Sequence, residues 1–272
     1  MYSLPQSYNQ TSKCKRCISS NAYEGLRQTL ESIKVQSYKN YELLLIDGNS
    51  TDNSIEVIKE YGYKYVSEPD NGPFDAMNKG IKKATGDYCI FMNSGDSFHN
   101  ETVLKSFVEL QPTKDIYTGI AAEHLNGKIH NWNPAKEEEL SMRFFYRHSL
   151  SHQASFIKTS IMKANLYDTN YKIVSDWLFF VKALLFQNVT YEPLSFFVCN
   201  YMDGGISRDA NKAFAEREKA LKQLFGLRIM RDFHTMQYGT NEWDAMAKRV
   251  DPESKIGKLI IKITKSLLTL RK

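Results

Sequence analysis

The sequence predicts an α/β fold with a mainly parallel, doubly wound sheet. Short apolar runs alternate with segments of about ten residues whose apolar side chains recur at helical spacing. Two of the apolar runs end in acid-bearing loops, at Asp47 and at Asp96. The carboxyl ends of parallel strands open onto one edge of a sheet, where ligands bind. These observations together predict a ligand-binding α/β domain.

The first half of the chain carries most of the alternating pattern. Helices are predicted from Tyr23, from Ile55, around 77–84 and over about 101–110, and strands are predicted at 41–46, 63–66, 88–92 and 115–121. The strands are short apolar runs, which are typical of buried parallel strands. Gly72-Pro73 and Gly86 mark helix boundaries.

The second half is predicted to contain more helix than strand. Helices are expected near 156–166 and 175–187, an extended run at 190–201, and further helices at 209–230 and 254–270. We therefore expect a helical C-terminal extension after the sheet. No internal repeat is visible in the sequence.

Composition excludes several classes of protein. Hydrophobic residues make up 42% of the 272 residues and charged residues 25%, which is ordinary for a globular chain. The net charge of +5 lies entirely in residues 252–272, because the other residues carry 30 basic and 30 acidic side chains. A basic tail without a basic face in the fold does not predict nucleic-acid binding.

The sequence shows no targeting signal and few cysteines, which leads us to expect a cytoplasmic protein. No apolar stretch approaches the roughly 18 residues of a transmembrane helix, and the first 25 residues lack the apolar region of a secretory signal. The four cysteines do not form a disulfide scaffold. Cys14 and Cys17 have zinc-like spacing, but no second pair follows to complete four ligands.

The acid-bearing loops suit a hard cation and a diphosphate. Magnesium takes few protein oxygens and completes its shell with phosphate oxygens and water, and Asp96 is a candidate ligand. The alternative is that each Asp caps the helix that follows it. The loops by themselves therefore predict only a nucleotide-binding domain.

Four motifs carry a resemblance to a known family. The first motif comprises residues 36–42 and 46–53, the second residues 67–72, and the third residues 75–81. The fourth comprises residues 84–87 and the sequence Asn93-Ser94-Gly95-Asp96. In this order they resemble family 2 glycosyltransferases with the Rossmann-like GT-A fold. The bacterial branch that builds exopolysaccharide and O-antigen, such as the colanic acid transferases, is the most similar branch. The resemblance covers about residues 21–205.

The resemblance implies an enzyme of the hexosyltransferase type. Such an enzyme moves a sugar from a nucleotide donor, UDP-linked in our expectation, to a glycan or lipid-linked acceptor with inversion and with Mg or Mn. The competing interpretation is an inactive GT-A protein that binds nucleotide or a partner without turnover. It arises because residues 1–20 are polar and place Lys13, Lys15 and Arg16 where the family has an apolar first strand. A nucleotidyltransferase is disfavoured, because no glycine-rich basic phosphate loop stands near the start.

The resemblance also assigns donor-site roles. Asp47 matches the acid that binds base and ribose, and Asp96 matches the last acid of the metal motif, where the family often has more acids than this chain. The donor loop and the helix after it match a segment that contains Glu68, Asp70, Gly72, Asp75 and Lys79.

The catalytic base is expected later in the chain. Asp176 matches the acid that opens a late helix, and its alternative role is a helix N-cap. His152 matches a family segment and could contact the diphosphate, the acceptor or the metal, or be purely structural. The segment 203–207 matches a loop that closes over the donor, or is a plain turn.

The chain is thus expected to have three parts. They are an atypical segment at 1–20, the GT-A domain at 21–205, and a helical region at 206–272. In the tail at 252–272, four lysines share one helical face, namely Lys255, Lys258, Lys262 and Lys265. Such a helix favours peripheral binding to the inner face of the bacterial inner membrane, where a lipid-linked acceptor lies. Packing of the tail on its own domain is the alternative.

Overall fold

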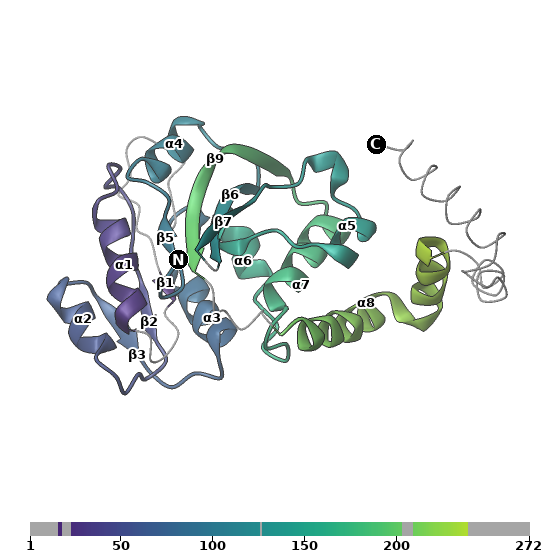
Figure 1. Ribbon diagram of the computed structural model, residues 1–272, viewed down its shortest axis with the longest axis horizontal. Helices are drawn as coiled ribbons and strands as arrows, with labels where there is room; N and C mark the ends of the chain where they lie inside the picture. Colours follow the sequence, from purple (N-terminus) through teal and green to yellow (C-terminus); the bar gives the residue numbers. More distant parts are fainter. Residues whose placement is uncertain (1–15, 18–22, 126, 203–208, 239–272) are drawn as a thin grey trace. The chain divides into compact units, whose positions relative to one another are not determined.

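The computed structural model describes residues 16–17, 23–125, 127–202 and 209–238 (Figure 1). The chain divides into two compact units, Met1–Arg217 and Glu218–Lys272, and all sites discussed below lie in the first. Several predicted features lie outside the described residues: most of the segment 1–20, the loop at 203–207, the helix at 254–270 and the basic tail.

The first sheet is parallel, as predicted. Its order is β1 (Arg16–Cys17), β2 (Leu45–Asp47) and β3 (Tyr65–Ser67). The helices α1 (Tyr23–Lys34) and α2 (Ser54–Glu60) connect these strands, and α3 (Pro73–Lys83) follows β3. Figure 1 shows α1 and α2 on one side of β2 and α3 on the other, the arrangement of a doubly wound sheet. The two-residue β1 pairs with β2 at one end of the strand order.

The second sheet is mixed, which corrects the expectation of a mainly parallel arrangement. Its order is β4 (Tyr88–Cys89), β8 (Ser155–Lys158), β6 (Ile116–Leu125), β9 (Tyr191–Met202) and β5 (Ser97–Phe98), and β7 (Lys128–Trp132) pairs with β6. Only β6 and β9 are parallel, and the other four pairings are antiparallel. The reason is visible for one of these pairings at Gly127, whose φ of 71° permits a tight turn between β6 and β7 in place of a crossover helix.

The remaining helices follow the predicted pattern with two exceptions, the start of α6 and the whole of α5. They are α4 (Val103–Glu109), α5 (Met142–Arg147), α6 (Thr159–Ala164), α7 (Ser175–Val181) and α8 (Ala210–Tyr238), and Lys182–Phe186 continue α7 as a π-helical turn. The helix predicted near 156–166 begins only at Thr159, because residues 155–158 form β8. Phe156 and Ile157 are both buried, since β8 pairs with a strand on each side. Strands β1, β5 and β7 and helix α5 were not predicted, and β1 lies in the segment 1–20, which was expected to be atypical and polar.

The core lies between the helices α1, α2 and α4 and the strands. Leu26, Leu30 and Ile33 of α1 are fully buried, as their helical spacing predicts. Phe107 of α4 stacks on Phe156 of β8 with ring centroids 3.9 Å apart. Each fully buried side chain of this size contributes about 1.5–3 kcal/mol. The core therefore holds the ends of β2 and β4, where the acid-bearing loops begin.

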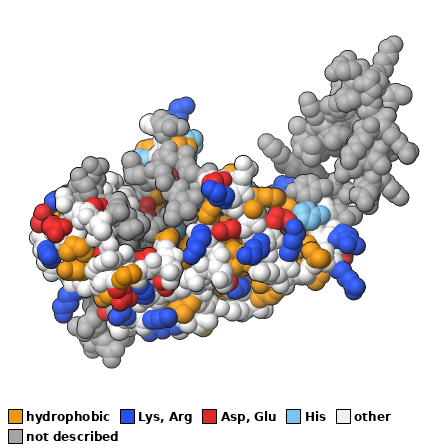
Figure 2. Space-filling model, turned by 90° about the horizontal axis from the view of Figure 1, so that it is seen from below, with side chains coloured by type: hydrophobic (Ala, Val, Ile, Leu, Met, Phe, Trp, Pro, Cys, Tyr) orange, Lys and Arg blue, Asp and Glu red, His pale blue; other side chains and the backbone are white. Residues whose placement is uncertain are grey.

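The surface carries charges of both signs. Figure 2 shows lysine and arginine side chains interspersed with acidic and apolar ones over one face. Within the described ranges, no helix is both long enough and apolar enough to cross a membrane.

Candidate active site

Asp47 ends β2, and its side chain is fully buried. Its carboxylate accepts hydrogen bonds from Ser67 Oγ at 2.6 Å, from the Ser50 N–H at 3.0 Å and from the Ser50 hydroxyl. The parallel register places Ser67 directly opposite Asp47. The carboxylate thus fastens the turn after β2 to β3. Its contact with a nucleotide stays a prediction, since both oxygens are engaged inside the protein.

A second loop lies against the end of β2. A Cβ on Gly48 would collide with the carboxylate of Asp70, so glycine at this position lets the two loops approach closely. Asp70 Oδ1 accepts a hydrogen bond from the Gly72 N–H at 2.9 Å. Gly72 has a φ of 116°, a conformation that favours glycine, and it stands directly before α3.

The same loop is closed by contacts from α3. Asp75 Oδ2 accepts a hydrogen bond from the Asn71 N–H at 3.0 Å. Lys79 Nζ donates to the Pro69 carbonyl at 2.6 Å and lies 3.3 Å from the Glu68 carboxylate. The residues predicted for the donor loop therefore belong to one hydrogen-bonded segment.

Asp96 lies in a tight turn between β4 and β5 and is buried. Its Oδ2 accepts a hydrogen bond from the Asn93 N–H at 2.8 Å, and its own N–H donates to the Asn93 carbonyl at 3.0 Å. Gly95, with a φ of 97°, supplies the backbone conformation of the turn. The carboxylate is thus held by the turn that presents it.

Helix α1 holds this turn from outside. Thr29 Oγ1 accepts a hydrogen bond from the Gly95 N–H at 3.0 Å and donates to the Gly25 carbonyl at 3.0 Å. A Cβ on Gly25 would lie 2.8 Å from Gly95 Cα, closer than carbon atoms can pack. The absence of a side chain at Gly25 therefore fixes the distance between α1 and the Asp96 turn.

Asp176 lies in the first turn of α7 and lines a cavity of about 420 Å³. The carboxylate side chain is 19% exposed, and its Oδ2 lies 2.7 Å from His152 Nδ1. His152 also lines the cavity, but its Nε2 is buried without a hydrogen-bond partner among the described residues. The contact between His152 and Asp176 was not predicted, because the two residues are 24 positions apart in the sequence, although each was predicted individually.

The Asp96 turn lies beside one wall of this cavity, because β5, which follows the turn, pairs with β9 in a register that sets Ser97 opposite Asn200, the neighbour of Tyr201. Burial raises the pKa of the Tyr201 phenol most, and the charges of Glu123 and Asp96 raise it further. Tyr201 and Glu123 both line the cavity that contains Asp176. The predicted metal ligand and the predicted base therefore influence the same cavity.

Arg217 of α8 places a cation at this cavity. Its guanidinium carbon lies 5.2 Å from the centre of the Trp177 ring, and the Trp177 Nε1–H donates to the Phe145 carbonyl at 2.7 Å. Burial lowers the pKa of Arg217, and the charge of Asp176 opposes this shift. Arg217 was not predicted, because its position on a helix gives no local signal.

Glu216, the neighbour of Arg217, was also missed. Its carboxylate accepts hydrogen bonds from the N–H groups of Lys172, Ile173 and Val174 at 2.9, 2.9 and 3.2 Å. These groups lead directly into α7. Lys172 Nζ also donates to the Asn71 carbonyl at 2.9 Å, so the same segment contacts the donor loop.

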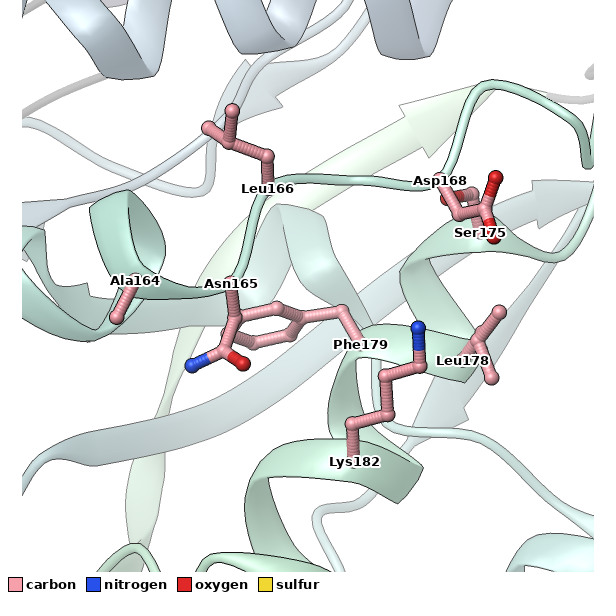
Figure 3. Close-up of a pocket in the computed structure, with 8 residues that line it drawn as sticks. All are labelled: Ala164, Asn165, Leu166, Asp168, Ser175, Leu178, Phe179 and Lys182. Atoms are coloured by element: carbon pink, nitrogen blue, oxygen red, sulfur yellow. The ribbon is translucent and has the colours of Figure 1, made fainter. Parts of the chain in front are cut away.

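A smaller cavity of about 180 Å³ uses other residues of α7 (Figure 3). Ser175, Leu178 and Phe179 of α7 and Lys182 of the π-helical turn line it, together with the last residue of α6 and residues that follow that helix. Its carboxylate, Asp168, accepts hydrogen bonds from the backbone and side chain of Asn170. This cavity does not include Asp176 or His152, so we assign the chemistry to the larger one.

Sequence comparison identifies the family. The model of the family "Glycosyl transferase family 2" matches residues 18–184 of this chain. The chain belongs to this family. An uncharacterized glycosyltransferase of Mycobacterium tuberculosis is 34% identical over 179 residues, which are 62% of this chain and 67% of the relative. A PGL/p-HBAD biosynthesis glycosyltransferase of Mycobacterium bovis is 26% identical over 214 residues, 74% of this chain and 81% of the relative.

Solved structures of glycosyltransferases share the fold. Staphylococcus aureus TarS 1–349 in complex with UDP-GlcNAc has a TM-score of 0.61 at 17% identity, covering 89% of this chain and 77% of that one. A mannosyltransferase of Pyrobaculum calidifontis in complex with GDP-Man and Mn²⁺ has a TM-score of 0.59 at 13% identity, covering 98% and 82%. The predicted GT-A fold is confirmed, and this family 2 protein is a glycosyltransferase.

Proposed function

We propose that this glycosyltransferase moves a sugar from a UDP-linked donor to a hydroxyl of a glycan or lipid-linked acceptor, with inversion, in bacterial exopolysaccharide or O-antigen synthesis. The placement of Asp176 carries the proposal. It is a partly exposed carboxylate at the start of α7, in a cavity of about 420 Å³, and His152 contacts one of its oxygens.

Asp176 acts as the general base in this proposal. The acceptor hydroxyl attacks the anomeric carbon, a new carbon–oxygen bond forms, and the bond to the diphosphate breaks. The proton of the hydroxyl passes to the Asp176 carboxylate, and the nucleoside diphosphate leaves with the electrons of the broken bond. A base in this role typically contributes ~10²–10⁴-fold to the rate.

A nucleotide sugar fits the loops at the other side of the site. The solved relatives bind UDP-GlcNAc or GDP-Man. In this chain the turn after β2 and the loop from Glu68 to Lys79 lie side by side, and Lys172 links that loop to the segment before α7. We assign the donor to these loops, with Asp47, Asp70, Gly72 and Asp75 shaping them.

A divalent cation, Mg²⁺ or Mn²⁺, fits Asp96. Asp96 Oδ2 accepts the Asn93 N–H, and the described residues contain no group of three side chains that could hold a metal by themselves. Magnesium is commonly bound by one or two carboxylates together with substrate phosphates, so a single acid suits an ion that enters with the donor. When bound, the ion would stabilise charge on the leaving diphosphate.

The acceptor fits the outer part of the cavity. Trp132 of β7 lines it, is 50% exposed, and donates its Nε1–H to the Glu123 carboxylate at 3.0 Å. The tethered indole offers a flat apolar surface beside polar groups, which suits a sugar ring. We further propose that residues 252–272, outside the described residues, bring the protein to the inner face of the bacterial inner membrane.

The test is a transfer assay with a panel of nucleotide sugars and glycan acceptors, read by mass spectrometry. Asp176→Asn should keep donor affinity, measured with fluorescent UDP, and lose ~10²–10⁴-fold in turnover. Asp168→Asn, on the smaller cavity, is the matched control and should retain turnover. If Asp176→Asn kept turnover, Asp176 would not be the base. If donor affinity fell together with the rate, Asp176 would be a binding or structural residue.

A further inference from the structure

We propose that His152 is a positioning residue for the reaction. With its proton on Nδ1, it holds Asp176 Oδ2 and leaves Oδ1 as the oxygen that receives the acceptor proton. This inference rests on the proposed function, in which Asp176 is the base. It differs from the diphosphate, metal or acceptor contact that the sequence predicted for His152.

The hydrogen bond between the two side chains determines the tautomer. An ionised carboxylate only accepts hydrogen bonds, and His152 Nδ1 lies 2.7 Å from Asp176 Oδ2. The proton must therefore be on Nδ1. Which nitrogen carries the proton is set by the partner of the other nitrogen, and here the only described partner is Asp176.

The second ring nitrogen supports the same conclusion. Nε2 is buried, without a hydrogen-bond partner among the described residues. The imidazole packs edge-on against the Phe91 ring, with the ring centroids 6.4 Å apart. An additional N–H at this place would be an unsatisfied buried donor, which is unfavourable, and more so when the ring is charged. A lone pair on Nε2 is the less costly state. His152 is thus built to donate once, to Asp176.

The backbone around His152 is held firmly, as a positioning role requires. His152 begins a 3-10 turn, His152–Ala154, that leads into β8. The Ser155 hydroxyl donates to the Ser151 carbonyl at 2.6 Å and lies 2.7 Å from the Thr118 hydroxyl of β6. The backbone that carries the imidazole is therefore fixed, and the hydrogen bond of the imidazole restricts the rotation of the Asp176 side chain.

The first test reads the tautomer without any substrate. Long-range ¹⁵N–¹H NMR of the full chain, labelled at its six histidines, distinguishes the two ring nitrogens. His152→Gln identifies the signal. We expect the proton on Nδ1 at pH 7.5 and a perturbed signal in Asp176→Asn. A proton on Nε2, or on both nitrogens, would overturn the proposal.

The second test separates positioning from general destabilisation. In His152→Asn, the amide nitrogen stands near the place of Nδ1 and can still donate to Asp176. We expect His152→Ala to lower kcat by about tenfold or more with little change in the donor KM, and His152→Asn to recover most of it. His130→Ala, an exposed histidine on β7, is the control.

The two tests keep this proposal distinct from the proposed function. Equal losses in His152→Asn and His152→Ala would refute the positioning role, as would a rise in donor KM that accounts for the loss. If no nucleotide sugar supports transfer, the proposed function fails, while the tautomer measurement still decides whether His152 holds Asp176. Thermal melting of each variant shows whether the fold is retained.

Discussion

Glu216 connects α8 to the start of α7 and thereby to Asp176. One carboxylate oxygen accepts the Lys172 N–H, and the other accepts the N–H groups of Ile173 and Val174. Val174 is the N-cap of α7, and the negative charge also faces the positive end of the helix dipole. We predict that Glu216→Ala destabilises the first unit and lowers turnover.

The size of the effect follows from these three contacts. A hydrogen bond to a charged group contributes about 1.5–3 kcal/mol. The three bonds share one carboxylate, and the exposed Lys172 N–H can turn to water, so their loss costs less than three times this value. We expect about 2–4 kcal/mol for Glu216→Ala and about half of that for Glu216→Gln, which keeps one acceptor oxygen. In a unit of this size, the loss of free energy of unfolding expected for Glu216→Ala lowers the melting temperature by about 4–16 °C.

Thermal melting and turnover should be measured on the same preparations. Lys212→Ala is the control, because Lys212 lies on the same helix and forms only an exposed ion pair with Asp209. We expect Glu216→Ala to lower kcat by roughly tenfold or more, since Asp176, the proposed base, loses its fixed position. A melting temperature within about 1 °C of the wild type would refute the energetic argument. Normal melting with lost turnover would instead place Glu216 in the chemistry.

Three further predictions follow from the same structure. Asp96→Ala should abolish transfer while the protein stays folded, with a melting temperature lowered by the lost bond to the Asn93 N–H, and turnover above a tenth of the wild-type value would exclude a metal role. Gly25→Ala should push α1 away from Gly95 and cost about 1–3 kcal/mol in stability, whereas Gln28→Ala, on the exposed face of α1, should be neutral in the same melting experiment. Deletion of 252–272 should abolish salt-sensitive co-sedimentation with anionic vesicles, and equal sedimentation of both proteins would refute membrane binding.

The predictable parts of the fold are those that local spacing determines. Leu26, Leu30 and Ile33 recur at helical intervals, and all three are buried in α1. The buried run before Asp47 gives β2, because a short apolar segment followed by a polar turn is typical of a parallel strand. The acid that opens α7 was predicted from motif resemblance and lies in the first turn of that helix.

The parts that were missed depend on contacts between distant segments. Residues 155–158 carry two apolar side chains and precede Ile161 and Met162, so their spacing suits a helix as well as a strand, and only pairing with β4 and β6 decides. Strand β7 is exposed along its whole length, so no alternation of apolar and polar residues marks it. Glu216 reaches 42 to 44 residues back along the chain, which no local pattern encodes.

Asp47 and Asp176 differ in how their carboxylates are hydrogen-bonded, although the motif resemblance gives a functional role to both. Asp47 uses both carboxylate oxygens on Ser50 and Ser67, and it is fully buried. Among the described residues, Asp176 has one hydrogen-bond partner, His152 on Oδ2, and it keeps part of its surface in the cavity. A carboxylate whose two oxygens both accept hydrogen bonds within the protein stabilises a turn, whereas one with an oxygen left for substrate can accept a proton. We therefore propose that the same motif chemistry supplies structure at the end of β2 and reactivity at the start of α7.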